Sequence, residues 1–259
     1  MKTAGLFLSL SSLVVLAALS IMSGNVQAQE VRHAPDGGSR ITIESIFIPP
    51  IPNAPFTATV VTEWTSRLAD GKEVTIKNHR TVARDSAGRI FQERRAFAPN
   101  AEQTPTRLTQ FEISDPSVGV QYICKPGEQV CVTRSYVRSQ AVTSAATLAS
   151  LPPKREASGR EANGEDLGHN TIEGLDTIGS RETTKIAAGV IGNDQPLSVI
   201  KEFWYSPQLG VNLVVNRIDP RSGTENFKVI DINISEPDSK LFEPPSDYKV
   251  VDARESATR

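Results

Sequence analysis

The chain has 259 residues, a formal net charge of -2 and a pI of about 6.0. Charges of both signs are interspersed, so the composition suggests neither a nucleic acid nor an anionic membrane surface as a partner. Aromatic residues make up 6% of the chain, which is low for a surface that binds carbohydrate or peptide.

The first residues have the pattern of a secretory signal peptide, since Lys2 precedes an apolar run from Ala4 to Met22 and Ala28 ends a short polar stretch. We expect cleavage after Ala28, so that residues 1–28 are removed. About 230 residues remain, enough for one large β domain or two small ones. No later run is long and apolar enough to span a bilayer, so we expect an exported protein, periplasmic or extracellular, without a transmembrane segment.

Residues 29–40 are polar and contain glycine, and we expect a disordered amino terminus there. Ile41–Ile48 has the composition of a short strand. Four prolines then make Pro49–Pro55 an extended strap, because proline fixes φ and lacks a backbone donor. Such a strap is a ligand for an aromatic groove or, as we favour, a stiff connector.

Three β-type runs follow, Phe56–Leu68, Val74–Arg84 and Arg89–Phe97, and they predict an antiparallel meander within a first unit, residues 41–136. The first run has an ordinary apolar face. The second run places Asn78, Arg80 and Arg84 on the face that carries its aliphatic residues. Either these positions face a partly solvated cavity or they mark a sheet edge, and the sequence favours neither.

Three further strands are expected at Arg107–Ser114, Val118–Cys124 and Val130–Tyr136. A four-residue loop between the last two places Cys124 directly opposite Cys131, with Cα atoms about 4.5 Å apart, which a disulfide accepts. In an exported protein this bridge should form. The six intervening residues differ from the Cys-x-x-Cys spacing of redox catalysts, so a structural crosslink is favoured.

Residues 137–166 are rich in Ser, Ala, Glu, Gly and Pro, and we expect a flexible linker or long loop. A second meander should occupy residues 167–251, as part of the same sheet, and residues 252–259 should form a disordered tail. The expected elements are strands at Asn170–Ile178, Ser180–Ile186, Leu197–Tyr205, Val211–Ile218, Phe227–Ile234 and Tyr248–Val251, and one helical turn within Glu236–Phe242.

The sequence holds few groups for catalysis or metal binding. The three histidines are His33, His79 and His169, and no pair of them has zinc-ligand spacing. Nucleophile-elbow, phosphate-loop and dinucleotide motifs are absent from the sequence. We therefore expect no enzyme activity, no cofactor and no metal site.

Cationic residues gather on the neighbouring strands of the first meander, and Asp85 and Glu93 lie among them. They could attract an anionic polymer or lipid headgroup, but we favour cross-strand ion pairs on a solvated face. The cationic residues are Lys77, Arg80, Arg84, Arg89, Arg94 and Arg95.

Several sequence segments resemble segments of uncharacterised exported proteins of soil bacteria, of acidobacterial type. They are Pro49–Phe56, Ala83–Arg95 and Glu202–Pro207. The order of elements up to Glu236–Val250 is similar to the close of proteins of the LolA-like half-barrel superfamily. That resemblance implies a curved antiparallel sheet that shelters acyl chains in the periplasm, although no strong amphipathic helix is present here as a lid.

We therefore expect an all-β protein, a strongly curved antiparallel meander sheet or half-barrel with few short helices. The function expected first is non-enzymatic binding of an apolar or lipid-like ligand on the concave face, lined by Trp64, Phe91, Trp204 and Tyr205. The alternative is a structural or protein-interaction module of the cell envelope without a small-molecule ligand.

Overall fold

A computed structural model describes residues 46–99, 106–137, 154–156 and 159–254. All of these lie in one compact unit that runs from Ile43 to Arg259. The expected signal peptide and amino-terminal segment lie outside the described residues, as do most of the expected linker up to residue 153 and the end of the expected tail.

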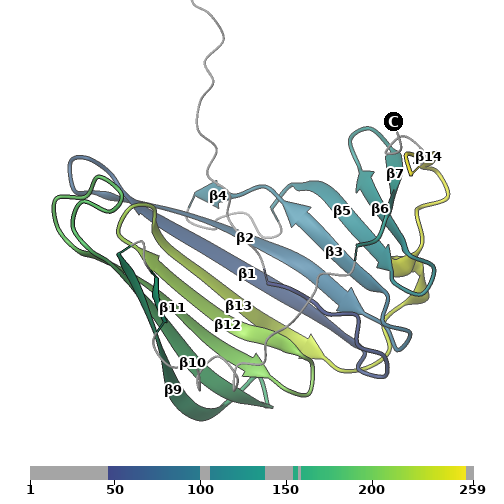
Figure 1. Ribbon diagram of the computed structural model, residues 1–259. Helices are drawn as coiled ribbons and strands as arrows, with labels where there is room; N and C mark the ends of the chain where they lie inside the picture. Colours follow the sequence, from purple (N-terminus) through teal and green to yellow (C-terminus); the bar gives the residue numbers. More distant parts are fainter. Residues whose placement is uncertain (1–45, 100–105, 138–153, 157–158, 255–259) are drawn as a thin grey trace, which may run out of the picture. The chain divides into compact units, whose positions relative to one another are not determined.

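The described chain is a single curved β-sheet of fourteen strands, with one short 3-10 helix, η1 (Ser239–Phe242) (Figure 1). The all-β, antiparallel fold class predicted from the sequence is confirmed. The strands are β1 (Phe56–Arg67), β2 (Glu73–Arg84), β3 (Ile90–Arg95), β4 (Ala98–Pro99), β5 (Leu108–Asp115), β6 (Val120–Lys125), β7 (Val130–Ser135), β8 (Lys154–Glu156), β9 (Arg160–Ile172), β10 (Leu175–Ile186), β11 (Leu197–Ser206), β12 (Val211–Asp219), β13 (Gly223–Asn233) and β14 (Lys249–Asp252).

The strand order is β14-β7-β6-β5-β3-β2-β1-β13-β12-β11-β10-β9-β8, with β4 paired to β2 at the side. The two meanders therefore belong to one sheet, and the antiparallel pair β1 and β13 joins them at its centre. Most consecutive strands pair as antiparallel hairpins. The exceptions are β7 and β8, which lie towards opposite ends of the sheet, β4, which pairs with β2 so that β3 pairs with β5, and β14, which returns to lie parallel to β7.

Local irregularities bend the sheet. Register shifts interrupt four strand pairs, β1 with β13, β3 with β5, β9 with β10 and β11 with β12. A β-bulge bends its strand and increases the right-handed twist. The four bulges account for the strong curvature that Figure 1 shows without closure of the sheet into a barrel.

The sheet carries a separate hydrophobic core on each of its two faces. On β2, Val82 belongs to the larger core whereas the next residue, Ala83, belongs to the smaller one, as strand alternation requires. We call the face of the larger core the inner face and the other the outer face. The inner core includes Phe56, Val60, Val82, Leu213, Val215, Phe227 and Val229; the outer core consists of Ala83, Phe91, Phe111, Ile113, Cys124, Cys131 and Phe242.

The two ends of the inner face differ. At one end lie residues 46–55, which include the predicted strap Pro49–Pro55 and which we call the strap from here on, together with the turn Ser206–Gly210. We call this end the strap end. At the other end, which we call the hairpin end, the β1–β2 hairpin lies beside the β12–β13 hairpin, since the Trp64 indole donates to the carbonyl of Ser222 over 2.9 Å. Gly210 has a positive φ of 68°, and a Cβ there would lie 2.3 Å from Ile51 of the strap.

Two sequence expectations about the chain path are wrong. Ile46–Ile48, the described part of the strand expected at Ile41–Ile48, is not a strand; Ile46 and Ile48 are buried in the inner core without ladder pairing. The strand expected at Asn170–Ile178 is interrupted by a turn, since Glu173 and Gly174 have φ of 51° and 76°. Two successive positive φ values are typical of a tight hairpin turn.

The expected linker also overlaps a strand. Residues 160–166 pair with β10 as the first half of β9. Most of these side chains are exposed, so the polar composition resembles that of a loop while the backbone follows the neighbouring strand. Composition therefore failed to distinguish a solvated strand near the edge of the sheet from a flexible segment.

The predicted hairpin disulfide is confirmed. Cys124 pairs directly with Cys131 and their Cα atoms are 4.0 Å apart. Both residues are fully buried in the outer core. The parallel strand β14 follows the same hairpin, with Val250 opposite Cys131, so the carboxy-terminal segment covers the edge that β7 would otherwise leave open.

Candidate functional site

At the strap end, the inner face is a dry core closed by a buried arginine. Arg84 at the end of β2 has no exposed surface. Its guanidinium donates to the carbonyl of Pro49 over 2.8 Å, to that of Ala54 over 2.9 and 2.8 Å, and to that of Leu209 over 2.8 Å. Arg84 thus joins both ends of the proline strap to the β11–β12 turn.

The environment of this guanidinium is neutral. It donates to three carbonyl oxygens and lies 5.1 Å from the centroid of the Phe56 ring. Burial lowers the pKa of Arg84 to about 10, so the group stays charged at neutral pH. Carbonyl oxygens and an aromatic face replace the water that the cation loses on folding.

The structure answers the question that the polar residues of β2 posed. β2 lies between β1 and β3 in the strand order, but in the described residues its ladders on the β3 side cover only Val82–Arg84, paired with β3, and Ile76 and Lys77, paired with β4. Arg84 therefore does not mark an edge, whereas Asn78 and Arg80 lie where β2 has no ladder partner on that side. Arg84 faces the strap and not a solvated cavity. Asn78 and Arg80 are buried as well, with 5% and 4% of their surface exposed, and they lie nearer the hairpin end.

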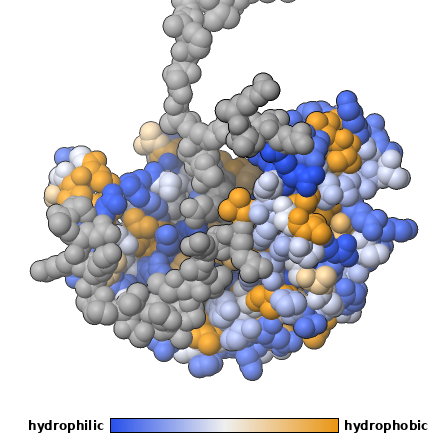
Figure 2. Space-filling model, turned by 45° about the vertical axis from the view of Figure 1, so that its right-hand side comes forward, coloured by the Kyte–Doolittle hydropathy of each residue, from blue (hydrophilic) through white to orange (hydrophobic). Residues whose placement is uncertain are grey.

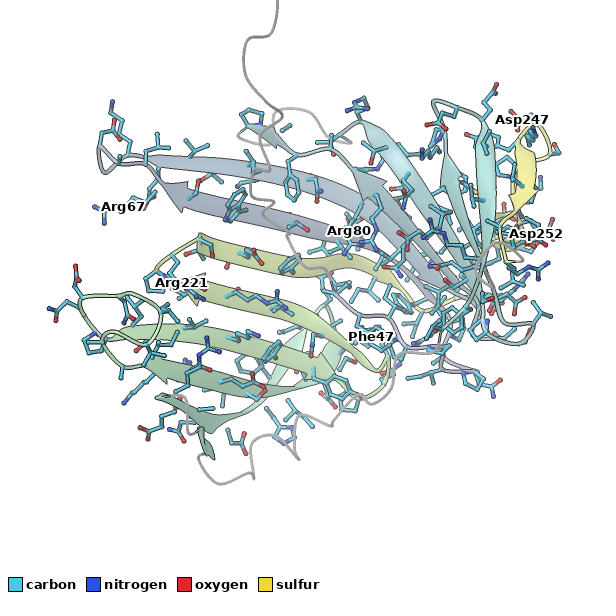
Figure 3. The ribbon with its side chains drawn as sticks, turned by 45° about the horizontal axis from the view of Figure 1, so that its top comes forward. Phe47, Arg67, Arg80, Arg221, Asp247 and Asp252 are labelled. Atoms are coloured by element: carbon cyan, nitrogen blue, oxygen red, sulfur yellow. A yellow bond between two sulfur atoms is a disulfide. The ribbon has the colours of Figure 1, made fainter. Side chains whose placement is uncertain are left out.

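The hairpin end of the inner face is also apolar, but its side chains are less buried than those at the strap end. Trp64 and Ile76 are cross-strand partners, and both are half-buried, as is Phe203 on β11. In Figure 3, Arg67 and Arg221 mark this end of the strands, Phe47 marks the strap, and Arg80 lies between them. The apolar surface here is incompletely covered by the described part of the chain, in contrast to the fully buried residues at the strap end.

Polar residues flank this apolar area on both sides. On β12 and β13, Arg217 lies 3.6 Å from Glu225, which is the cross-strand neighbour of Trp64. On β3 and β5, Arg94 pairs with Glu112 over 3.1 Å. Figure 2 shows one view of the molecule in which orange apolar residues form separate patches among blue hydrophilic ones. The hairpin end therefore combines an apolar floor with charged flanks.

Arg80 and Asn78 lie at the boundary between the apolar and the polar part. Burial, followed by repulsion from Arg94, lowers the pKa of Arg80 to about 9, and Glu112 and Glu93 act in the opposite direction. The side chain therefore remains cationic at neutral pH. Asn78 donates through Nδ2 to the carbonyl of Arg95 over 3.0 Å. This arrangement can bind a molecule that is apolar along most of its length and polar at one end.

The four aromatic residues predicted to line a ligand do not share a face. Trp64 lies on the inner face, whereas Phe91 is buried in the outer core with its ring 5.9 Å from that of Phe111. Trp204 lies on the outer face, where its ring packs against Gly179; a Cβ on that glycine would lie 2.8 Å from the indole.

Tyr205 is half-buried beside the bulge in β11, opposite Ile178. The neighbouring aromatic residue Phe203 packs against the inner core, but the sequence argument did not select it. Its cross-strand partner Val215 would have identified the face, because directly opposite residues in a sheet share a side.

The expected cross-strand ion pairs form for part of the cationic group. Lys77 pairs across strands with Glu63, and Arg94 with Glu112. Arg89 pairs with Asp85 at the β2–β3 turn, and Arg95 pairs with Glu93 within β3, so these two pairs are not cross-strand. Arg80 and Arg84 were expected on a solvated face of the sheet, but both are buried on the inner face.

Neither a metal-binding cluster nor a membrane-spanning helix is found among the described residues. They contain no group of three or more His, Cys, Asp or Glu side chains arranged to hold a metal ion. Within the same residues, no helix has the length and apolar character needed to cross a membrane.

Comparison with known proteins gives only weak structural likeness. No protein-family model matches the sequence, and no curated protein does. Among solved structures, an uncharacterized conserved protein from Thermus thermophilus is 11% identical with a TM-score of 0.37, over 77% of this chain and 90% of that one. MucB in its Pseudomonas aeruginosa complex with MucA is 14% identical with a TM-score of 0.37, over 77% and 58%. A LolA superfamily protein from Nitrosomonas europaea is 12% identical with a TM-score of 0.30, over 74% and 91%.

One of these structures is that of a LolA superfamily protein, the group that the sequence resemblance named. The TM-scores are too low to support an argument about function. The functional inference below therefore depends on the residues of this chain.

Proposed function

We propose that this protein is an exported, non-enzymatic binding protein that holds an apolar or lipid-like ligand at the hairpin end of the inner face. The observation that supports it is the change in side-chain burial along the inner face of the central strands. The inner residues of β1 are fully buried at Phe56 and Val60 but only half-buried at Trp64. Burial of the exposed apolar area by a ligand would contribute roughly 25 cal/mol per Å².

The ligand area is narrower than the sequence suggested. Trp64, Ile76 and Phe203 form its apolar part, and the polar residues around them set the position of a ligand end group. Trp204 and Phe91 pack on the outer face, so they serve as internal references for binding. The strap covers the other end of the face and restricts the ligand to the hairpin end.

The two tryptophans allow a direct test, because one lies on each face. In Trp204→Phe only Trp64 fluoresces, and in Trp64→Phe only Trp204 does. A fatty acid brominated along its chain quenches an indole that it contacts, so we expect strong quenching in Trp204→Phe and little in Trp64→Phe. Equal quenching in both variants, or none in either, would contradict the proposal.

A second experiment addresses the natural ligand. Native mass spectrometry of the protein purified from its own envelope should show a bound lipid-sized mass that organic solvent removes. A clean apo mass together with no binding of a fluorescent fatty acid would contradict lipid binding.

A separate observation favours the alternative, a protein-interaction module. In the described part of the chain β14 pairs only with β7, and its four residues are all exposed, including Val250 and Val251. A free strand edge can accept a strand from another protein. A photocrosslinking residue at Val251 should then capture a specific envelope protein, and Val250→Pro should abolish the adduct. Crosslinking that recovers no partner protein would contradict this function.

A further inference from the structure

In the part of the chain that the structure describes, a buried acceptor on the inner face lacks a hydrogen-bond partner. The side chain of Asn78 uses its Nδ2 to donate to the carbonyl of Arg95, and this bond fixes the orientation of the amide. Oδ1 points the other way and has no partner among the described residues, although only 5% of the residue is exposed. An unsatisfied buried acceptor is costly and rare in native proteins, so it calls for a group that supplies a hydrogen.

The position of Asn78 relates this acceptor to the proposed ligand area. Asn78 lies opposite Thr62 on β1 and next in the inner row after Ile76, which is opposite Trp64. On the other side of β2, the inner-face residues of β3 and β5 beyond the buried Ile90 are polar, with Gln92 opposite Glu112. The Asn78 acceptor therefore lies where the apolar floor ends and the polar flank begins.

The charges around Asn78 limit the chemistry of the missing donor. Oδ1 can only accept, so ethers, esters and ionised carboxylates cannot bond to it. Arg80, the next residue in the same row, is a buried cation that repels ammonium groups. A neutral hydroxyl group is compatible with both Asn78 and Arg80, since its hydrogen can bond to the Asn78 Oδ1 and its lone pairs are attracted to the Arg80 cation.

We propose that the ligand carries a hydroxyl group on an otherwise apolar body and that Asn78 recognises this hydroxyl. This inference rests on the proposed function and specifies its ligand class. The apolar body lies over Trp64 and Ile76, and the hydroxyl lies at the Asn78 boundary.

The test compares two ligands of equal length, 1-dodecanol and methyl undecyl ether, as competitors of the fluorescent probe N-phenyl-1-naphthylamine. The alcohol can donate and the ether cannot. With the natural sequence we expect the alcohol to bind about tenfold more tightly, the effect of one buried hydrogen bond. In Asn78→Leu, which has nearly the same shape, the affinity for the ether should persist and the preference for the alcohol should vanish.

The matched control is Asn216→Leu on β12, where the asparagine is cross-strand from Glu202. It should retain the tenfold preference. Equal affinity for alcohol and ether in the natural sequence would overturn the hydroxyl inference. Water would then be the donor to Asn78, and the proposed function would remain intact. Failure of both ligands to displace the probe would overturn the proposed function as well. The comparison within the natural sequence decides the question even if Asn78→Leu does not fold.

Discussion

The strap end and the hairpin end of the inner face use buried polar residues in opposite ways. At the strap end, Arg84 is fully buried and its guanidinium bonds to three backbone carbonyls. At the hairpin end, Asn78 is almost as deeply buried, yet no described residue bonds to its Oδ1. Both residues lie on the same face of β2. A buried polar residue thus contributes to stability at Arg84, where the fold completes its bonds, whereas under the proposed function the bond missing at Asn78 is completed by a ligand.

The largest effect should come from removing the strap anchor. Arg84→Met leaves the carbonyls of Pro49, Ala54 and Leu209 without their donor, and we expect the free energy of unfolding to fall by about 3–5 kcal/mol. Urea denaturation measures the change. The control is Arg94→Met at the hairpin end, which loses one partly exposed ion pair with Glu112 and should cost less than about 1 kcal/mol. Equal losses in the two variants would contradict the contrast between the ends.

The disulfide tests whether the outer face acts independently of the inner one. The double variant Cys124→Ala with Cys131→Ala removes a crosslink that closes a short loop, and we expect a loss of about 2.5 kcal/mol in the chain-entropy model. Thermal and urea unfolding measure this loss. Fatty acid binding at 25 °C should not change, because both cysteines lie in the outer core. A parallel loss of binding would show that the two faces are coupled.

The pH dependence tests a charged group of the outer face. Burial raises the pKa of Glu93, but bonds from Arg95 and from the Thr81 amide outweigh it and leave the pKa below its ordinary value of 4.5. Because the folded-state pKa is depressed, the stabilisation is complete above pH 4.5 and is lost as the pH falls through the folded-state pKa.

Glu93→Gln should therefore lower the free energy of unfolding by about 1–2 kcal/mol at pH 7 and by progressively less below pH 4.5. Urea titrations at a series of pH values measure this convergence. The exposed Glu128→Gln is the control and should cost little at any pH, since its pair with Lys125 is at the surface. A constant difference between Glu93→Gln and the natural sequence at all pH values would rule out the proposed linkage.

The smallest effect distinguishes the two tryptophans. Trp64→Leu should weaken fatty acid binding about fivefold, which corresponds to about 1 kcal/mol, whereas Trp204→Leu should leave affinity unchanged. Probe displacement measures both affinities. The reverse order would move the ligand to the outer face.

The sequence predicted the architecture well because it depends on local patterns. Alternating strands, Pro- and Gly-containing turns and the spacing of Cys124 and Cys131 specify hairpins, and the observed sheet follows them closely. The pairing of distant segments was harder to predict. The parallel return of β14 onto β7 joins residues that are about 120 positions apart, and no local pattern encodes it.

The site was predicted only in part, for two physical reasons. Alternation gives two faces to each strand but does not relate the faces of different strands, so Trp64, Phe91 and Trp204 appeared equivalent although they lie on two faces. The partners of a buried polar residue are also hidden in the sequence. Arg84 bonds to carbonyl oxygens that any residue could supply, and therefore nothing distinguished its role from that of Asn78.

The central pair of strands, β1 and β13, has a consequence for the order of folding. During synthesis β1 emerges before its partner β13, which follows after more than 150 residues. Until then the first meander has an open edge at β1, a surface on which incomplete chains can aggregate. Contacts of such long sequence separation form slowly. We expect the newly made chain to need protection by a holding chaperone until Asn233 has emerged and β1 can pair with β13 at the centre of the sheet.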